Sequence, residues 1–252
     1  MTEYFGETYP IKELTVKECE GFREYLITAK SQRNESKIST NTAVSYYGNF
    51  RATLKLAYQE GHLLQDLDKR AGSIKPEETE RQFLTLEELQ ALVNTPCPND
   101  LLRKAALFSA LTGLRYSDIE KLTWEEIHHS EATGYSLRFR QKKTKGSETF
   151  PISEQAVLLL GERKTGKVLE GLTYSNTLLE QLRTWVNEAK IAKYVTFHSF
   201  RHTYAILQIS SGTGFFTLSK MMGHRDLKTT QVYAKVMDKA KQDAANKIKL
   251  VL

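Results

Sequence analysis

The sequence predicts a mainly helical protein with a small antiparallel β-sheet, divided into two domains. Three observations lead to this fold class. Helix start and stop signals recur along most of the chain, two short segments alternate as strands do, and one polar stretch without periodicity separates a front section from the rest. With 252 residues, 40% of them hydrophobic, the chain has room for two compact cores.

The front section shows the signals of two helices. Thr15 and Glu18 have the spacing of a capping box and open the first helix. After a polar loop, Asn41 or Thr42 is expected to cap a second helix, which ends at Gly61. Apolar residues recur at helical spacing in both segments, so the front section is predicted to be all-helical.

The domain boundaries follow from this pattern. Residues 1–75 are assigned to the helical front domain, residues 76–82 to a polar linker, and residues 83–252 to a second domain with a C-terminal tail helix. Thr85 and Glu88 form another capping box at the start of the second domain. The helices predicted there cover residues 85–95, 100–111, 117–122, 176–189, 199–211, 216–222 and 227–236.

A β-hairpin is predicted in the second domain. Residues 135–140 and 148–152 alternate as strands do, and the segment between them contains a glycine that suits the turn. His128 and His129 are interpreted as a polar turn. Residues 138–145 of the hairpin contain no acidic residue and five basic ones, Arg138, Arg140, Lys142, Lys143 and Lys145. Such a patch meets phosphates, and the net charge of +6 favours a polyanionic partner more weakly.

Other compositional signals exclude several classes of protein. The two cysteines, Cys19 and Cys97, lie far apart and predict neither a disulfide framework nor a zinc site. His198 and His202 have the spacing of a metal pair on a helix, but no third ligand matches, so we expect no metal and assign His202 a buried hydrogen bond. The chain shows no signal peptide and no membrane-length apolar run, which favours a cytoplasmic protein.

The C-terminal part carries the most informative motif. His198 and Arg201 lie three residues apart, His224 follows Gly223, and Tyr233 comes nine residues later, while Arg115 closes an upstream Thr-Gly-Leu-Arg segment. Two arginines can clamp two oxygens of a phosphate, and a tyrosine can attack its phosphorus if its proton is removed, because a free phenol has a pKa of about 10. These residue types suit cleavage of a phosphodiester by a phenol.

The motif resembles that of the tyrosine recombinases, also called the phage-integrase family. The matching residues are Arg115, Lys143, His198, Arg201, His224 and Tyr233, in the family's order within residues 84–236. Residues 10–75 resemble the family's helical core-binding domain by helix pattern and position alone. Many integrases of the family carry a further N-terminal arm-binding domain, for which this chain has no room.

The resemblance implies a role for each matching residue. Tyr233 would be the nucleophile and form a 3′-phosphotyrosyl link, while Arg115 and Arg201 would clamp the scissile phosphate. His224 would donate to the phosphate, and His198 would accept the phenol proton or hold the phosphate. The leaving 5′ oxygen would be protonated by Lys143, with Lys145 as the alternative, and Asp118 would support the site structurally. Candidate DNA contacts are Arg138, Arg140, Lys142 and Lys145 in the hairpin and Lys37, Arg51 and Lys55 in the front domain.

The resemblance also implies an assembly and leaves alternatives open. We expect a bacterial or phage-type enzyme that needs no cofactor, forms a C-shaped clamp on double-stranded DNA, and acts as a homo-tetramer on DNA, whether or not it is a monomer when free. Directionality factors and host DNA-bending proteins stay open as further partners. The alternatives are a type IB topoisomerase-like enzyme and a catalytically silent DNA-binding regulator.

Overall fold

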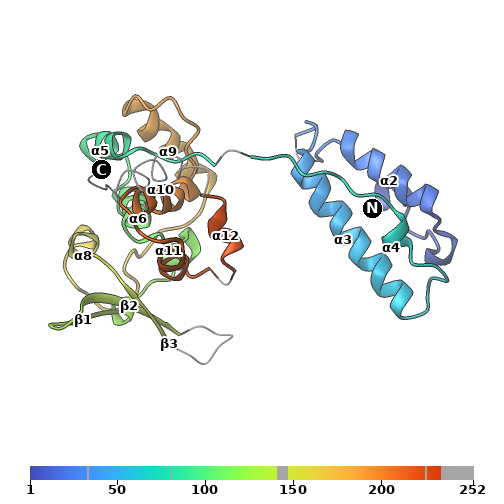
Figure 1. Cartoon of the computed structure of the whole chain (residues 1–252). Helices are drawn as coiled ribbons and strands as arrows, with labels where there is room; N and C mark the ends of the chain where they lie inside the picture. Colours follow the sequence, from blue (N-terminus) through green and yellow to red (C-terminus); the bar gives the residue numbers. More distant parts are fainter. Residues whose placement is uncertain (33, 80, 141–146, 225, 234–252) are drawn as a thin grey trace, which may run out of the picture. The chain divides into compact units, whose positions relative to one another are not determined.

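The computed structural model describes the chain at residues 1–32, 34–79, 81–140, 147–224 and 226–233 (Figure 1). The chain divides into two compact units, a first unit of Met1–Glu80 and a second unit of Arg81–Leu252. The described part is mainly helical and contains a three-stranded antiparallel sheet, which confirms the predicted fold class. None of the described helices is both long and apolar enough to cross a membrane.

The first unit is built on two long helices. Its elements are α1 (Thr2–Phe5), η1 (Ile11–Glu13), α2 (Val16–Thr28), α3 (Thr40–Gln59) and α4 (Leu67–Arg70). The capping box of Thr15 and Glu18 opens α2 as predicted. Phe22 of α2 meets Phe50 of α3 edge to face at 4.9 Å, and this contact lies in a continuous buried cluster. Burial of one apolar face of each helix therefore holds the first unit together.

The start of α3 differs from the prediction. Ser39, not Asn41 or Thr42, is the N-cap, because its hydroxyl accepts the amide proton of Thr42 over 3.2 Å. The Asn41 side chain instead accepts from the amide of Glu77 over 3.1 Å and donates to its carbonyl over 2.9 Å. The side chain of Asn41, which the local pattern assigned to capping, thus binds a residue 36 positions away in the sequence.

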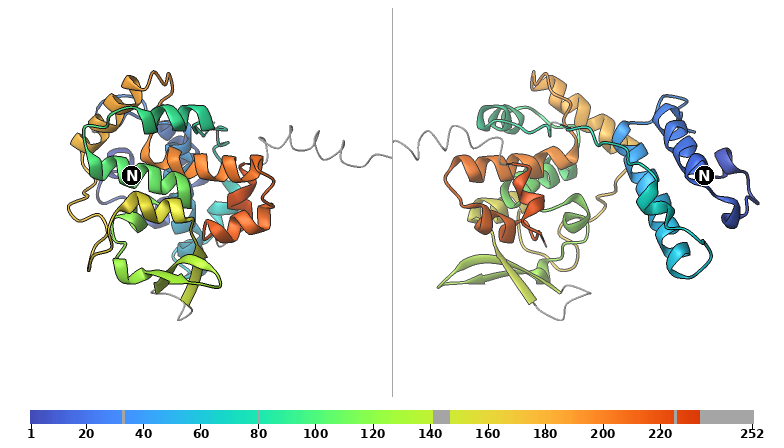
Figure 2. Two further views of the ribbon diagram at one scale, coloured as in Figure 1. Left: turned by 90° about the vertical axis from the view of Figure 1, so that its left-hand side faces the viewer. Right: turned by 45° about the vertical axis from the view of Figure 1, so that its right-hand side comes forward.

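The second unit packs its helices around α6. Its helices and turns are α5 (Leu86–Asn94), α6 (Asp100–Thr112), α7 (Tyr116–Ile119), η2 (Trp124–Glu126), α8 (Glu154–Leu160), α9 (Asn176–Glu188), α10 (Phe197–Ser210), α11 (Phe215–Met221) and α12 (Lys228–Gln231). Thr85 and Glu88 form the predicted capping box of α5. Helix α10 packs against α6 (Figure 2). Phe108, Trp185 and Phe200 are fully buried in the core of this unit.

A small sheet lies at one side of the second unit (Figure 1). Its strands β1 (Ile127–Ser130), β2 (Gly134–Arg140) and β3 (Ser147–Pro151) pair antiparallel in that order. The predicted hairpin corresponds to β2 and β3, in which Leu137 pairs with Phe150. The interpretation of His128 and His129 as a turn is wrong, because both lie in β1, where His129 pairs with Tyr135 and its ring lies tilted against the Tyr135 ring at a centroid distance of 4.5 Å.

A second buried cluster joins α10, α11 and the segment after α12. Tyr204 and Ile206 of α10, Leu218 of α11, Met222 and Tyr233 belong to it. The described part of the last predicted helix is the single turn of α12, and the tail beyond Tyr233 lies outside the described residues. This cluster positions the C-terminal motif against α10.

Candidate active site

Arg201 lies at the centre of the candidate site and is only 3% exposed. Its Nη1 donates to the carbonyl of Gly113, which ends α6, and its Nη2 donates to the carbonyl of Met222, which ends α11, over 2.7 Å. The carbonyl ends of helices carry partial negative charge and stabilise a cation. No carboxylate among the described residues lies within ion-pair distance of Arg201. Burial, followed by the charge of Arg115, lowers the pKa of Arg201 to about 10. The site therefore keeps a buried positive charge that favours an anion.

Glycine is required where Arg201 meets the end of α6. Gly113 adopts the left-handed conformation with φ +72, and a β-carbon there would lie 2.5 Å from the ring of Tyr204. Both the backbone conformation and the close approach of that ring favour glycine. The turn then places Arg115 two residues further on, beside Arg201.

Arg115 and Asp118 lie together at the start of α7. The amide of Arg115 donates to Oδ2 of Asp118 over 3.4 Å, and its Nη1 lies 3.9 Å from the same oxygen. The guanidinium is half exposed, so it is accessible to a ligand. An open pocket of about 320 Å³ adjoins it and is lined by Ser109, Leu114, Arg115, Tyr116, Ser117, Tyr174, Phe197, His198 and Arg201. Three of the predicted catalytic side chains thus border one pocket.

His224 connects Arg201 to the segment that carries Tyr233. Its Nε2 lies 2.9 Å from Nη2 of Arg201, and its Nδ1 lies 2.8 Å from Oγ1 of Thr230. Because a guanidinium only donates, Nε2 accepts from Arg201 and the ring proton lies on Nδ1, which donates to Thr230. Burial, followed by the positive charge of Arg201, lowers the pKa of His224 to about 4. His224 is therefore neutral at pH 7.

Tyr233 is 4% exposed and lies in the same cluster. Its hydroxyl lies 2.7 Å from Nδ1 of His202, and its ring meets the His202 ring at a centroid distance of 5.7 Å. The ring of His202 in turn meets His198 edge to face at 4.6 Å. Burial raises the pKa of Tyr233, while the positive charges of Arg81 and Arg201 oppose that rise. Tyr233 therefore contacts His202 directly and lies close to Arg81 and Arg201 of its own chain.

The pKa of His198 is lowered by burial and then by the charge of Arg201. His202 is affected more strongly, since burial followed by the proximity of His198 lowers its pKa to about 3. Both imidazoles are thus favoured in the neutral form. A neutral imidazole offers one donor and one acceptor nitrogen, which suits hydrogen bonding to a phenol and to a phosphate.

Arg81 is a site residue that sequence reasoning missed. Its guanidinium faces the hydroxyl of Tyr233 and lowers the pKa of that phenol, and its charge also lowers the pKa values of His198, His202 and His224. The segment that carries Arg81 is fixed to α10, because the amide of Leu84 donates to Oγ1 of Thr203 over 2.9 Å. An arginine in a polar stretch without periodicity gives no sequence signal of such a contact.

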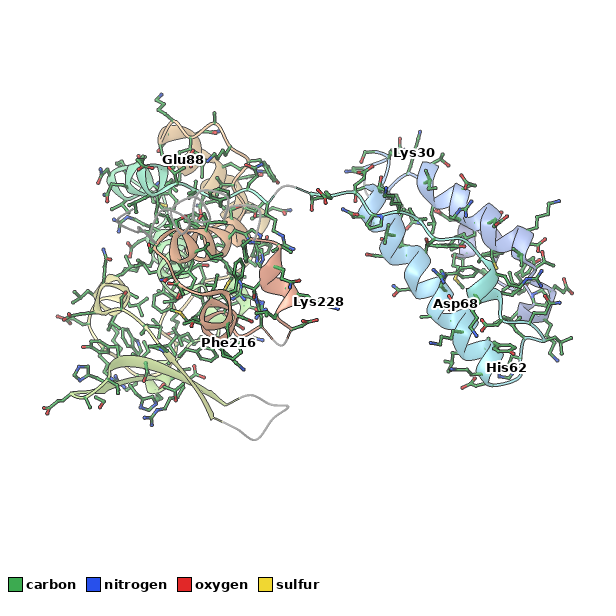
Figure 3. All side chains as sticks on the ribbon, viewed as in Figure 1. Lys30, His62, Asp68, Glu88, Phe216 and Lys228 are labelled. Carbon is green, nitrogen blue, oxygen red and sulfur yellow. The ribbon has the colours of Figure 1, made fainter. Side chains whose placement is uncertain are left out.

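The remaining predicted residues are either outside the described part of the chain or exposed, apart from Arg51. Lys142, Lys143 and Lys145 fall outside the described residues, as does the side chain of Arg140, and Arg138 is exposed on β2. In the first unit, Lys37 and Lys55 are exposed. Arg51 pairs with Asp68, which is labelled in Figure 3: its Nε donates to Oδ1 over 2.7 Å and its Nη2 to the carbonyl over 2.9 Å. This pair ties α4 to α3. Within the described ranges, no group of histidines, cysteines or acidic residues is arranged to hold a metal ion.

Comparison with known proteins identifies the family. The model of the phage integrase family matches residues 82–240, and that of the phage integrase SAM-like domain matches residues 1–71. Because the first match covers more than half of the chain, this chain belongs to the phage integrase family. The resemblance that the sequence motif indicated is thereby confirmed.

Individual relatives agree with this assignment. The chain is 28% identical over 197 residues to tyrosine recombinase XerD of Halalkalibacterium halodurans, covering 69% of this chain and 64% of the relative. It is 28% identical over 173 residues to the integrase of Escherichia phage P2, covering 68% of this chain and 48% of the relative. The chain thus spans about half to two thirds of the length of these curated relatives.

Two solved structures share the fold. XerH site-specific recombinase bound to palindromic difH substrate, a post-cleavage complex, has a TM-score of 0.72 at 16% identity, over 97% of this chain and 76% of the other. A lambda integrase(75-356) dimer bound to a COC′ core site has a TM-score of 0.68 at 16% identity, over 98% and 86%. Both comparisons support the mainly helical fold with its small sheet.

Proposed function

We propose that this chain is a site-specific tyrosine recombinase that cleaves and rejoins DNA strands through a covalent 3′-phosphotyrosine, for integration or excision of a mobile element. One observation carries the proposal. The buried hydroxyl of Tyr233 contacts His202, whose ring meets His198, and it lies close to Arg201, an arginine that has no acidic partner among the described residues. A buried tyrosine used only for packing would not require the positive charges of Arg81, Arg201 and Arg115 around its hydroxyl.

The proposed cleavage step is a transesterification. The Tyr233 oxygen forms a bond to phosphorus, the bond from phosphorus to the 5′ oxygen breaks, and the phenol proton passes to His198. The 5′ oxygen receives a proton from Lys143, with Lys145 as the alternative. The phosphotyrosine conserves the energy of the broken bond, so the reverse attack by a 5′ hydroxyl rejoins the strand without ATP. The reaction needs no metal or other cofactor.

The arginines supply electrostatic stabilisation in this proposal. Arg201 is fixed before DNA arrives, and such pre-aimed donors stabilise charge in a transition state without reorganisation. Arg115 is accessible on the other side of the pocket and completes a two-arginine clamp. Both ring nitrogens of His224 are engaged within the protein, so the exchange of one contact must accompany any donation to the phosphate.

The wider assembly follows from the family resemblance. The first unit acts as the core-binding domain, with Lys37, Arg51 and Lys55 as its candidate DNA contacts. Arg138, Arg140, Lys142 and Lys145 contact the DNA backbone from the hairpin of the second unit. Both units contact double-stranded DNA, four copies assemble on two sites, and the enzyme acts in the cytoplasm of a bacterial cell.

A covalent trap tests this function. Nicked suicide duplexes tiled across the DNA that flanks the gene are incubated with the protein, and adducts are resolved on a denaturing gel and mapped by mass spectrometry. The expected result is an adduct at Tyr233 that is lost in Tyr233→Phe and kept in Tyr194→Phe, a matched change at an exposed tyrosine. An adduct that persists in Tyr233→Phe refutes the assignment of the nucleophile.

The same assays separate the two alternatives. A type IB topoisomerase-like enzyme would relax a supercoiled plasmid that lacks a recombination site and would give no exchanged products. A silent regulator would bind the duplexes and never become covalently linked to them.

A further inference from the structure

The hydroxyl of Tyr233 contacts a residue to which the family motif assigns no role here. Nδ1 of His202 lies 2.7 Å from that oxygen, and His202 and Tyr233 are only 7% and 4% exposed. We propose that His202 positions the nucleophile by accepting the hydrogen bond of the Tyr233 hydroxyl at Nδ1. This inference rests on the proposed function of Tyr233 as the nucleophile.

The direction of the hydrogen bond follows from the surroundings of the phenol. The positively charged guanidinium of Arg81 lies close to the same oxygen and carries only donor groups, so it cannot accept the phenol proton. The phenol proton is then free to point to Nδ1 of His202, which is the acceptor nitrogen of a neutral ring. The neutral ring is favoured because burial and the nearby His198, Arg81 and Arg201 all oppose a further positive charge.

The same surroundings distinguish positioning from full proton transfer. Since His198, Arg81 and Arg201 disfavour an imidazolium at His202, the ring is a poor final acceptor for the phenol proton. An accepted hydrogen bond instead fixes the direction of the O–H bond and thereby directs the remaining lone pair of the oxygen. Such orientation lowers the barrier of an in-line displacement because the attacking geometry is set in advance.

The backbone of α10 links this contact to the rest of the site. Arg201 and His202 are adjacent on one rigid helix, the first bound to the ends of α6 and α11 and the second to Tyr233. A second hydrogen bond, from His224 to Thr230, holds the turn that precedes the tyrosine. The segment that carries the nucleophile is therefore held at two points by histidines of its own chain.

Two substitutions at one position test this inference. In His202→Asn the side-chain oxygen lies close to the former place of Nδ1, whereas in His202→Gln it extends toward that of Nε2. At saturating DNA we expect His202→Asn to form adduct within about threefold of the unaltered rate, and His202→Gln to fall by about tenfold or more, as expected when orientation is lost. The DNA affinity of both variants should stay unchanged, since His202 is buried.

A matched control and two outcomes complete the experiment. The same pair of changes at His62, which is exposed near the end of α3, should leave the rate unchanged (Figure 3). Equal rates in His202→Asn and His202→Gln, whether both unchanged or both reduced, overturn the inference. If the unaltered chain forms no adduct, the proposed function itself fails, which is a separate result.

A spectroscopic readout covers the case in which a variant does not fold. In protein labelled with ¹⁵N-histidine, the Nδ1 resonance of His202 should move when Tyr233→Phe removes only the hydroxyl, because the hydrogen bond is lost. An Nδ1 resonance that does not respond to Tyr233→Phe would overturn the inference on the native fold.

Discussion

The buried guanidinium of Arg201 lies 2.9 Å from Nε2 of His224, and the two side chains come from segments that meet only in the folded chain. Arg201 also binds the carbonyls that end α6 and α11. One side chain thus fixes the ends of two helices and orients the histidine that holds Thr230. The stability of this part of the second unit and the geometry of the candidate site depend on the same contacts.

Arg201→Lys should therefore impair both stability and cleavage. A lysine has one compact donor group and cannot reach both carbonyls and the histidine as the guanidinium fork does. We expect a loss of about 1–3 kcal/mol in the free energy of unfolding from the unpaired buried groups. We also expect a fall of about 100-fold or more in the rate of adduct formation. Urea denaturation and single-turnover assays measure the two effects.

Arg183→Lys provides the control for this change. Arg183 is exposed on α9, where it lies over the ring of Tyr194 at 5.8 Å. Its replacement should leave the cleavage rate unchanged. A cleavage rate for Arg201→Lys equal to that of Arg183→Lys would contradict a role for the fork of Arg201.

Gly113→Ala should destabilise the second unit more than the same change at Gly166. The two glycines have similar backbone angles, φ +72 and φ +75, so the conformational cost of placing alanine in the left-handed region is the same at both positions. A β-carbon at Gly113 would meet the Tyr204 ring at 2.5 Å, whereas at Gly166 it would meet nothing within 4 Å. Overpacking should add about 1–3 kcal/mol at Gly113. Equal urea midpoints for Gly113→Ala and Gly166→Ala would contradict this prediction, because they would show that the Tyr204 ring moves away without loss of stability.

The stability of the protein should fall as the pH is lowered from 7.5 to 5. His202 and His224 have pKa values of about 3 and about 4 in the folded chain, below the ordinary value of 6.5. Below pH 6.5 these two histidines bind protons in the unfolded chain but stay neutral in the folded chain, so acid favours unfolding. Urea midpoints at several pH values measure the trend, and His202→Asn, which removes one of these groups, should make the trend shallower. A midpoint that is constant over this range would contradict the neutral state of both rings in the folded chain.

Sequence pattern predicted the parts of this protein that depend on neighbours along the chain. The capping boxes at Thr15 and Thr85 need only a partner three residues away, and both form. The predicted N-cap of α3 was wrong because the side chain of Asn41 forms hydrogen bonds with the backbone of Glu77, a residue on a distant segment. Strand β1 was missed because its histidines show no apolar alternation, and its pairing with β2 alone makes it a strand.

The candidate site shows the same division. The order and spacing of the motif residues indicated Arg115, His198, Arg201, His224 and Tyr233, and the structure brings these side chains into one cluster. The hydrogen bond between Tyr233 and His202 and the approach of Arg81 to Tyr233 could not be predicted from the sequence. Each joins segments whose relative placement depends on the packing of the second unit. Motif spacing therefore predicts which residues take part, and tertiary contacts decide which of them touch.

Thr230→Val should loosen the segment that carries Tyr233. Thr230 is fully buried, and its Oγ1 accepts the proton of Nδ1 of His224 over 2.8 Å. Valine has nearly the same shape and lacks the hydroxyl, so the half-buried imidazole of His224 loses its acceptor at a cost of about 1–3 kcal/mol. We expect a lower urea midpoint and an adduct rate reduced by about tenfold, because the nucleophile is then held at one point only. Thr229→Val, at the exposed neighbouring position, is the matched control and should change neither value. If Thr230→Val and Thr229→Val behave alike, the hydrogen bond from His224 does not hold the nucleophile in place.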